Sequence, residues 1–416
     1  MKKILIVGLA MFAGMGALKV SAATEAELRA KAAALVAQMT MRPHVRIAKV
    51  GRASARNPQH ETVRPIRWMK AVPDEMKIDG EWLPSAIGYF FGVGLADELN
   101  VPVGIVDITW GGTDIDAWTP PSGYEGKDGF ARERDWHYLS DEEWDDGKQI
   151  HGPCGGAIQQ PRVLWNGMVA PFVQMAFRGV LWYQGCQNMH DPARYAAKMH
   201  ALYDGWATEF GMPDMPFVFA QLAPFGDSRV VAIQEAQERF AREERRAALV
   251  TTCDHGTLSD CHPSEKSAVA RRFLAQALAR CYGRTGLRAD PPWFRDAHVE
   301  GNVVVLSFEN ARGFYQYHPD WSVESGFEIC GKDGVWHKGV ITNLVEHRCA
   351  PYKSHGKISG ETLSVASSEV VEPRSIRYLH SAPWYGSIKN ELSLPIGPFH
   401  VDLETGSRRD EEGGCP

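Results

Sequence analysis

The strongest constraint on the fold is a continuous apolar run that ends in a polar, glycine-containing turn, RGVLWYQGCQN from Arg178 to Asn188. The four residues from Val180 to Tyr183 are typical of a strand buried on both faces, as in a parallel sheet that is covered by helices. In open α/β sheets, ligands bind just past the carboxyl ends of the strands. We therefore expect Gln184 and the residues up to Asn188 to face a pocket.

Strand and helix patterns alternate along the rest of this region, which is typical of an α/β domain with a parallel sheet. Further strands are predicted over 103–108, 217–222 and 248–252, and helices over 24–39, 84–99, 192–211, 231–242 and 264–283. Beyond Pro291 the pattern changes to short alternating runs separated by Gly, Asp and Asn, which predicts a small all-β module. The expected organisation is an α/β domain over 24–288, a β domain over 289–405 and a disordered tail over 406–416.

The first residues have the layout of a secretory signal peptide. Lys2 and Lys3 precede an apolar stretch, and small residues follow at 21–23. We therefore predict a signal peptide over 1–23 and a secreted or periplasmic protein. The alternative is that Ile4 to Phe12 form the first strand of the sheet. No other segment reaches about 18 uncharged apolar residues, so we predict no membrane span.

Charge and cysteine content limit the partners and the compartment. The formal net charge is -6 and no basic run stands out, which argues against binding to nucleic acid or to an anionic membrane surface. The eight cysteines suit an oxidising compartment. Cys330 and Cys349 lie in the same strand-rich region and are the first disulfide to test.

Three loops that follow predicted strands carry residues suited to catalysis. They are Gly111–Gly112, the turn over 184–188, and the segment from Asp260 to His262. If these loops meet at one edge of the sheet, they supply what acyl transfer requires: a base, a carboxylate that orients it, and donors that stabilise an oxyanion.

Each group has a candidate role and a plainer alternative. His262 is the candidate base, with Asp260 or Asp254 as the carboxylate that orients it. Asn188 and the amide of Gly112 are the candidate donors. The alternatives are that His262 is a surface or capping residue in front of a helix and that the two glycines form an ordinary tight turn.

These motifs occur in the order and approximate spacing of the sialate O-acetylesterases, carbohydrate esterases of the SGNH hydrolase superfamily. The chain resembles that family in six collinear segments: SAIGYFFGVGLADELNVPVGIVDITWGGTDIDAW from Ser85, PRVLWNGMVAP from Pro161, GVLWYQGCQN from Gly179, FVFAQLAPF from Phe217, DCHPSEK from Asp260 and SIRYLHSAPWYGSIKNELSLPIGPFHVD from Ser375.

The resemblance implies a flavodoxin-like, three-layer α/β/α hydrolase domain with an appended β-sandwich. It also implies removal of acetyl groups from a sugar, such as sialic acid, by a serine nucleophile without metal or cofactor. Position by position, His262 corresponds to the base and Asp260 to its acid partner. Asn188 corresponds to the polar residue that helps bind the oxyanion, and Gly112 to the glycine loop. Gln184 is a further candidate for oxyanion or substrate binding.

The chain departs from the family pattern in two places. The family's GQSNM motif, which carries the nucleophile after the first strand, is not recognisable, and its best counterpart, GMGAL from Gly14, places Gly16 where the serine belongs. The second departure is Cys186, where the family usually has Glu. The nucleophile is therefore unknown. The N-terminus is either a genuine leader or the remnant of the first strand in an N-terminally truncated chain.

Four functions remain open from the sequence. The first is a carbohydrate O-acetylesterase, and the second is a sugar-binding pseudoenzyme that keeps the pocket and His262. A third uses Cys186 as a replacement nucleophile. A fourth is a metal site of Cys253, His255, Cys261 and His262, although this spacing matches no common zinc pattern.

Overall fold

The computed structural model describes residues 4–9, 42–72, 75–78, 81–82, 84–137, 157–256, 262–316, 325–347, 355–381, 385–406 and 408. The chain forms two compact units. The first comprises Met1–Gln187, Lys198–Val218 and Lys266–Ala277, and the second comprises Asn188–Ala197, Phe219–Glu265 and Leu278–Pro416. Among the described helices, none is long and apolar enough to traverse a lipid bilayer.

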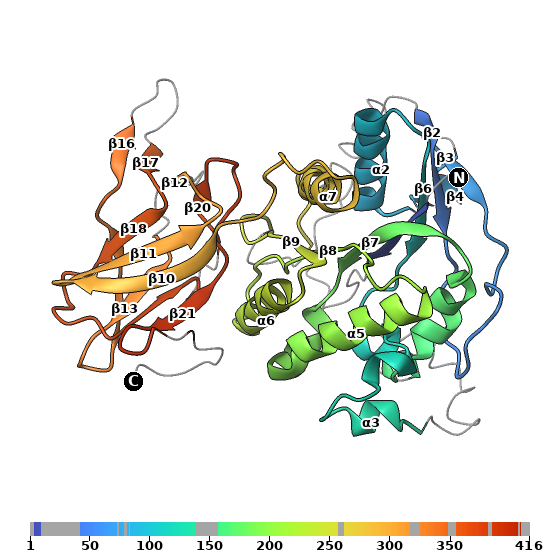
Figure 1. The fold of residues 1–416 in the computed structure, drawn as a ribbon, viewed down its shortest axis with the longest axis horizontal. Helices are drawn as coiled ribbons and strands as arrows, with labels where there is room; N and C mark the ends of the chain where they lie inside the picture. The colour runs from blue at the N-terminus through green and yellow to red at the C-terminus, as the bar shows by residue number, and fades with distance from the viewer. Residues whose placement is uncertain are drawn as a thin grey trace, which may run out of the picture. The chain divides into compact units, whose positions relative to one another are not determined.

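A seven-stranded sheet in the order β3-β2-β6-β1-β7-β8-β9 organises the α/β part of the chain (Figure 1). Its strands are β1 (Ile4–Leu9), β2 (Arg42–Lys49), β3 (Trp68–Ala71), β6 (Val103–Ile108), β7 (Phe177–Tyr183), β8 (Phe217–Ala220) and β9 (Ala247–Val250). β1 pairs in parallel with β6 and β7, β2 pairs in parallel with β6, and β3 is an antiparallel edge strand. Counted in chain order without β2 and β3, the sheet has the 2-1-3-4-5 order of flavodoxin-like folds.

Residues Ile4–Leu9 occupy the centre of this sheet as strand β1. This is the position that the alternative interpretation of the N-terminus gives to the segment, whereas the signal peptide stays a prediction. The helix predicted over 24–39 lies outside the described residues. Of the predicted tail, the structure describes Gly406 and Arg408, and Arg408 forms a β-bridge with Val401.

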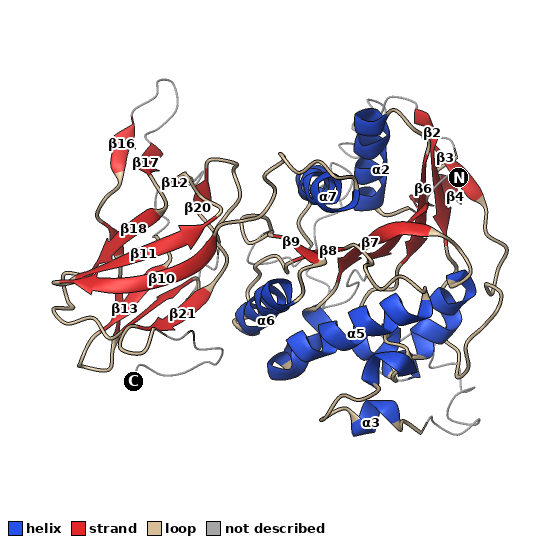
Figure 2. Cartoon of the chain, viewed as in Figure 1, coloured by secondary structure: helices blue, strands red, loops and turns tan. Residues whose placement is uncertain are grey.

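Helices cover both faces of the sheet, as a buried parallel sheet requires. Figure 2 shows α2 (Ala86–Leu99) and α7 (Lys266–Cys281) on one face and α5 (Tyr195–Glu209) on the other. The predicted end of α2 is confirmed, since the helix stops at Asn100, which has φ of 49°. Its start lies two residues after the predicted one, because the Ser85 hydroxyl caps the helix by accepting a hydrogen bond from the Gly88 amide.

Strand β7 is buried on both faces, as its apolar run predicts. On one face, the ring of Trp182 lies 6.2 Å from that of Trp118 and 6.0 Å from that of Trp206, both edge to face. Edge-to-face pairs add to the free energy gained from burying these large side chains. The strand that carries the predicted site is thus fixed by an aromatic core.

In the second unit, α6 (Arg229–Glu243) packs against β9. The C-terminal module consists of antiparallel sheets, as predicted. The first sheet contains β10 (Trp293–Glu300), β11 (Val303–Glu309), β18 (Thr362–Ala366) and β15 (Val340–Ile341). The second sheet contains β16 (Val345–His347), β17 (His355–Ser359), β12 (Gly313–Gln316) and β20 (Ile388–Asn390). The third sheet contains β14 (Trp336–Lys338), β13 (Phe327–Cys330), β19 (Ser375–Tyr378) and β21 (Phe399–Asp402). A short hairpin, β4 (Lys77–Ile78) and β5 (Glu81–Trp82), lies apart from them in the sequence.

Alternate residues of β11, namely Val304, Leu306 and Phe308, point into a hydrophobic core that the sheets of the module share. The period of two in the sequence therefore marks the residues of β11 that face the core, as predicted. Cys330 in this module is disulfide-bonded, and its predicted partner Cys349 lies outside the described residues.

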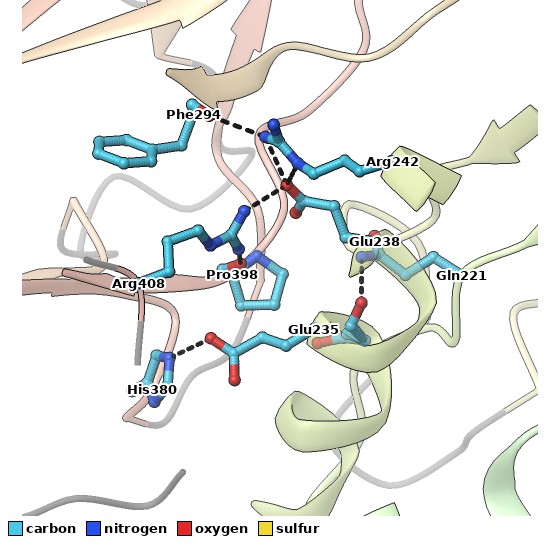
Figure 3. Close-up of polar contacts among 9 residues, drawn as sticks. Gln221, Glu235, Glu238, Arg242, Phe294, His380, Pro398 and Arg408 are labelled. Carbon is cyan, nitrogen blue, oxygen red and sulfur yellow. Dashed lines mark hydrogen bonds and ion pairs between the residues drawn. The ribbon is translucent and has the colours of Figure 1, made fainter. Parts of the chain in front are cut away.

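Helix α6 is linked to the C-terminal module through a buried carboxylate (Figure 3). Oε1 of Glu238 lies 2.6 Å from Nη1 of Arg408 and 2.9 Å from Nη2 of Arg242, which also donates to the carbonyl of Phe294 at 2.8 Å. Burial by itself would raise the pKa of Glu238, but Arg408 and Arg242 lower it below its usual value. The two cations thus keep this carboxylate ionised in a buried position.

We predict that Glu238→Gln lowers the free energy of unfolding by about 3 kcal/mol at pH 7, because it leaves two arginines without their shared anion. Since the folded-state pKa is lowered, the wild-type advantage is present above the usual glutamate pKa of about 4.3 and is lost as the pH falls through the lowered value. Urea unfolding at pH 7 and at pH 3 measures both effects. Glu361→Gln, at the exposed pair with Arg295, is the control and should change stability by less than about 1 kcal/mol. Equal losses in the two variants would contradict the prediction.

Candidate functional site

The turn predicted to face a pocket lies at the topological switch point of the sheet. Tyr183, the last residue of β7, is the register partner of Leu9, the last residue of β1. In flavodoxin-like sheets the ligand crevice lies outside the carboxyl ends of these two strands. Gln184 therefore follows β7 at the place in the fold where ligands bind.

The glycine loop after β6 has a backbone that requires glycine. Gly112 has φ of 73°, in the left-handed region that L side chains disfavour. The Thr113 hydroxyl donates to the carbonyl of Trp110 at 2.9 Å and accepts from the indole nitrogen of Trp118 at 2.9 Å. The two glycines thus belong to a fixed loop with specific hydrogen bonds.

The structure brings this glycine loop together with the β7 turn. The side-chain nitrogen of Gln184, a buried residue, donates to the carbonyl of Thr113 at 3.0 Å. This contact gives Gln184 a role that the sequence did not indicate, namely to hold the glycine loop. Its role in oxyanion or substrate binding stays a prediction.

Gln159 is a second residue that holds the glycine loop by hydrogen bonds, and nothing in the sequence indicated it. It ends the short 3₁₀ helix η3 (Ala157–Gln159), and its side-chain oxygen accepts from the amide of Asp114 at 2.7 Å. Its side-chain nitrogen donates to the carbonyl of Gly112 at 2.5 Å. One side chain therefore fixes the backbone on both sides of Thr113. No periodic pattern or motif could have marked Gln159, because its partners lie about 45 residues earlier in the chain.

A buried ion pair fixes the segment that follows the glycine loop. Asp116, in the 3₁₀ helix η1 (Ile115–Trp118), lies 2.8 Å from the ammonium of Lys198 on α5 and accepts from the Tyr124 hydroxyl at 2.9 Å. Burial first, and then the negative charge of Asp116, raise the pKa of Tyr124 well above its ordinary value. Tyr124 therefore acts as a neutral donor.

A second buried carboxylate fixes the start of the same loop. Asp107, near the end of β6, lies 3.1 Å from the ammonium of Lys49 and accepts from the amide of Ser85 at 2.8 Å. Lys49 also donates to the hydroxyl of Thr109. Carboxylates on both sides of the glycine loop thus anchor it to neighbouring elements.

The other candidates belong to the second unit. Asn188 lies in the 3₁₀ helix η6 (Cys186–His190) and is buried, and His262 is half-buried in front of α7. Asp260 lies outside the described residues. The buried carboxylate of Asp254, the other candidate for orienting His262, lies 2.7 Å from the ammonium of Lys389 and 3.8 Å from Nε2 of His255.

The remaining candidates concern the nucleophile and the metal site. The region that would hold the counterpart of the family serine, around Gly16, lies outside the described residues. Cys186 is half-buried and is not part of a disulfide. Within the described part of the chain, no group of three or more His, Cys, Asp or Glu side chains is arranged to hold a metal ion, and Cys261 of the predicted cluster lies outside it.

A family model, the curated proteins and the solved structures each give a match to an acetylesterase. Residues 142–283 match the family described as carbohydrate esterase, sialic acid-specific acetylesterase. The chain is 27% identical to the sialate O-acetylesterase of Pongo abelii over 271 residues, covering 60% of this chain and 49% of that protein. The chain is also 27% identical to the sialate O-acetylesterase of Homo sapiens over 267 residues, covering 56% of this chain and 48% of that protein. The chain thus spans about half the length of the curated relatives it matches.

A solved structure extends the similarity over nearly the whole chain. A carbohydrate acetylesterase from Xanthomonas citri superposes with a TM-score of 0.72 at 25% identity, covering 96% of this chain and 80% of that chain. The predicted fold is therefore confirmed, as an SGNH-type α/β/α sheet with an all-β C-terminal module.

We predict that Gly112→Ala lowers the free energy of unfolding by about 1–2 kcal/mol, because alanine is strained in the left-handed conformation. Gly286→Ala is the matched control, since its φ is not in this region and no atom lies within 4 Å of a Cβ built there. Urea unfolding of both variants measures the difference. An effect at Gly112 no larger than that at Gly286 would show that the loop is not held in this conformation.

Proposed function

We propose that this chain, whose residues 142–283 match the sialic acid-specific acetylesterase family of carbohydrate esterases, hydrolyses acetyl esters on sugars such as sialic acid, with His262 as the general base. The observation that carries the proposal is the glycine loop held by Gln184 and Gln159 at the carboxyl edge of the sheet. Such a fixed loop has the property that an oxyanion hole requires, namely donors that need no reorganisation during the reaction.

In the proposed reaction, His262 takes the proton from a nucleophile that attacks the acetyl carbon. Asp260 holds the imidazole in the tautomer that accepts this proton. The amide of Gly112 and the side chain of Asn188 donate to the carbonyl oxygen as negative charge develops on it. The proton on His262 then passes to the sugar oxygen that leaves, and water hydrolyses the acetyl group from the nucleophile.

The nucleophile is not assigned, and this favours a second candidate function. The 416-residue sequence contains no GQSN motif, and Cys186 stands where the family usually has Glu. In serine hydrolases, loss of the nucleophile lowers turnover by about a millionfold, although binding and oxyanion stabilisation remain. The second candidate is therefore a protein that binds acetylated sugars with little or no turnover.

The place of action is proposed from the sequence of the N-terminus. The positively charged residues, the apolar stretch and the small residues up to Ala23 support a secreted or periplasmic protein. Acetylated sugars or sialic acids are the proposed partners, and neither nucleic acid nor a cofactor is expected.

We predict that His262→Ala lowers kcat/KM for acetate release from acetylated sialic acid or a nitrophenyl acetate by about a hundredfold or more, because general base catalysis is lost. The control is His298→Ala, an exposed histidine of β10, which should keep wild-type activity. Equal rates of acetate release in wild type and His262→Ala would exclude His262 as the base.

A fluorophosphonate distinguishes the two candidate functions. An esterase with a serine nucleophile should gain one phosphonyl group per chain, which intact mass spectrometry detects, and peptide mapping then identifies the serine. Binding of acetylated sugar by calorimetry, without labelling and without acetate release, would support the sugar-binding protein. Two results together would instead assign the reaction to the thiol: iodoacetamide abolishes acetate release in wild type, and Cys186→Ala releases no acetate.

A further inference from the structure

The loop that follows β9 carries a buried charge whose partner comes from the C-terminal module. The side chain of Asp254 is fully buried, and one of its oxygens lies 2.7 Å from the ammonium of Lys389 on β20. Lys389 is itself largely buried, with 13% of its side chain exposed. Burying a carboxylate is unfavourable unless a cation and hydrogen bonds compensate for the lost water. Lys389 therefore supplies a cation that compensates for the burial of Asp254.

Two further contacts join the same loop to the same part of the module. The amide of Gly386 donates to the carbonyl of Cys253 at 2.8 Å, and the Cys253 thiol donates to the carbonyl of Ile396 at 3.2 Å. A Cβ at Gly386 would lie 2.9 Å from the Cys253 sulfur, so this approach requires glycine. Cys253 is also part of the hydrophobic core of the module. The loop after β9 is thus packed into the module by its backbone, its thiol and its carboxylate.

Helix α6 contributes separate links to the module. Glu238 binds Arg408, and Glu235 lies 3.1 Å from Nε2 of His380 (Figure 3). These contacts attach the module even when the contact of Asp254 is removed. Lys389 is therefore not required merely to keep the module in place, and its contact has a local consequence, on the loop after β9.

The candidate base follows this loop in the sequence, since His262 comes eight residues after Asp254, with residues 257–261 outside the described part of the chain. We propose that Lys389 is a positioning residue: through Asp254 it fixes the start of the segment that presents His262, so that the C-terminal module is part of the hydrolytic machinery. This inference rests on the proposed function for the role of His262. The contact between Lys389 and Asp254 stands independently of that role.

The experiment compares Lys389→Met, Lys389→Arg and the double variant Asp254→Asn with Lys389→Met in the full-length protein. Methionine keeps most of the apolar stem but removes the charge, whereas arginine keeps the charge. The control is Arg295→Met, which breaks the exposed pair with Glu361 in the same module. The measurements are kcat and KM for acetate release, and hydrogen–deuterium exchange of peptides that cover residues 248–256.

We expect Lys389→Met to lower kcat by about tenfold with KM nearly unchanged, which corresponds to about 1.4 kcal/mol of lost transition-state stabilisation. Exchange over 248–256 should be at least about tenfold faster than in wild type, as expected when a buried charge loses its partner. Lys389→Arg should recover most of kcat and of the protection, and the double variant should recover part of the protection because it buries no unpaired charge. Arg295→Met should match wild type in every measurement.

Wild-type exchange over 248–256 in Lys389→Met would overturn the inference, whether or not the protein hydrolyses acetyl esters. Faster exchange in Lys389→Met that returns to the wild-type rate in Lys389→Arg, without any change in kcat, would also overturn it, because the lysine would then stabilise the loop without positioning the base. If Lys389→Met does not fold, the double variant is compared with Lys389→Arg. Wild-type kcat and wild-type exchange over 248–256 in the double variant would then overturn the inference. Failure of the proposed function has a different signature, namely equal acetate release in wild type and His262→Ala.

Discussion

The burial of β7 on both faces is the constraint on which the α/β part of this protein depends. A strand that presents Trp182 to an aromatic core, and that pairs with β1, needs neighbours on both edges and helices on both faces. The parallel order then brings the carboxyl ends of β1 and β7 to one edge. Polar residues that interrupt the apolar run, beginning with Gln184, are placed at the switch point because the strand ends there.

At that edge, side-chain amides and buried charges hold the backbone of the glycine loop after β6 in one conformation. Gly112 can adopt its left-handed conformation, but glycine by itself would leave the loop free to adopt others. Gln184 and Gln159 restrict it through hydrogen bonds to the carbonyls of Thr113 and Gly112. The ion pairs of Asp107 and Asp116 fix the segments on either side. Preorganisation of this kind is what an oxyanion-binding loop needs.

In the second unit, helix α6, strand β9 and the loop that follows it form one compact body with the C-terminal module. The links are mostly charged: Glu238 with Arg408, Glu235 with His380, and Asp254 with Lys389. Buried pairs contribute little net stability when formed but are costly to break, so they specify how these segments pack more than they strengthen it. The appended β module is therefore tied to the loop after β9, which precedes the candidate base in the sequence.

The sequence by itself determined the segments whose apolar residues recur with a period of 2 or 3.6, because these periods report directly which faces of a strand or helix are buried. It predicted β7, α2 and the β module, and it indicated Gly112 because two glycines after a strand let backbone amides approach a ligand closely. It missed β2, whose residues RPHVRIAK carry no clear alternation. Only the tertiary structure decided which polar side chains meet. Gln159 contacts Gly112 and Lys389 contacts Asp254 across long stretches of chain, and such partners follow from the packing of strands and not from local pattern.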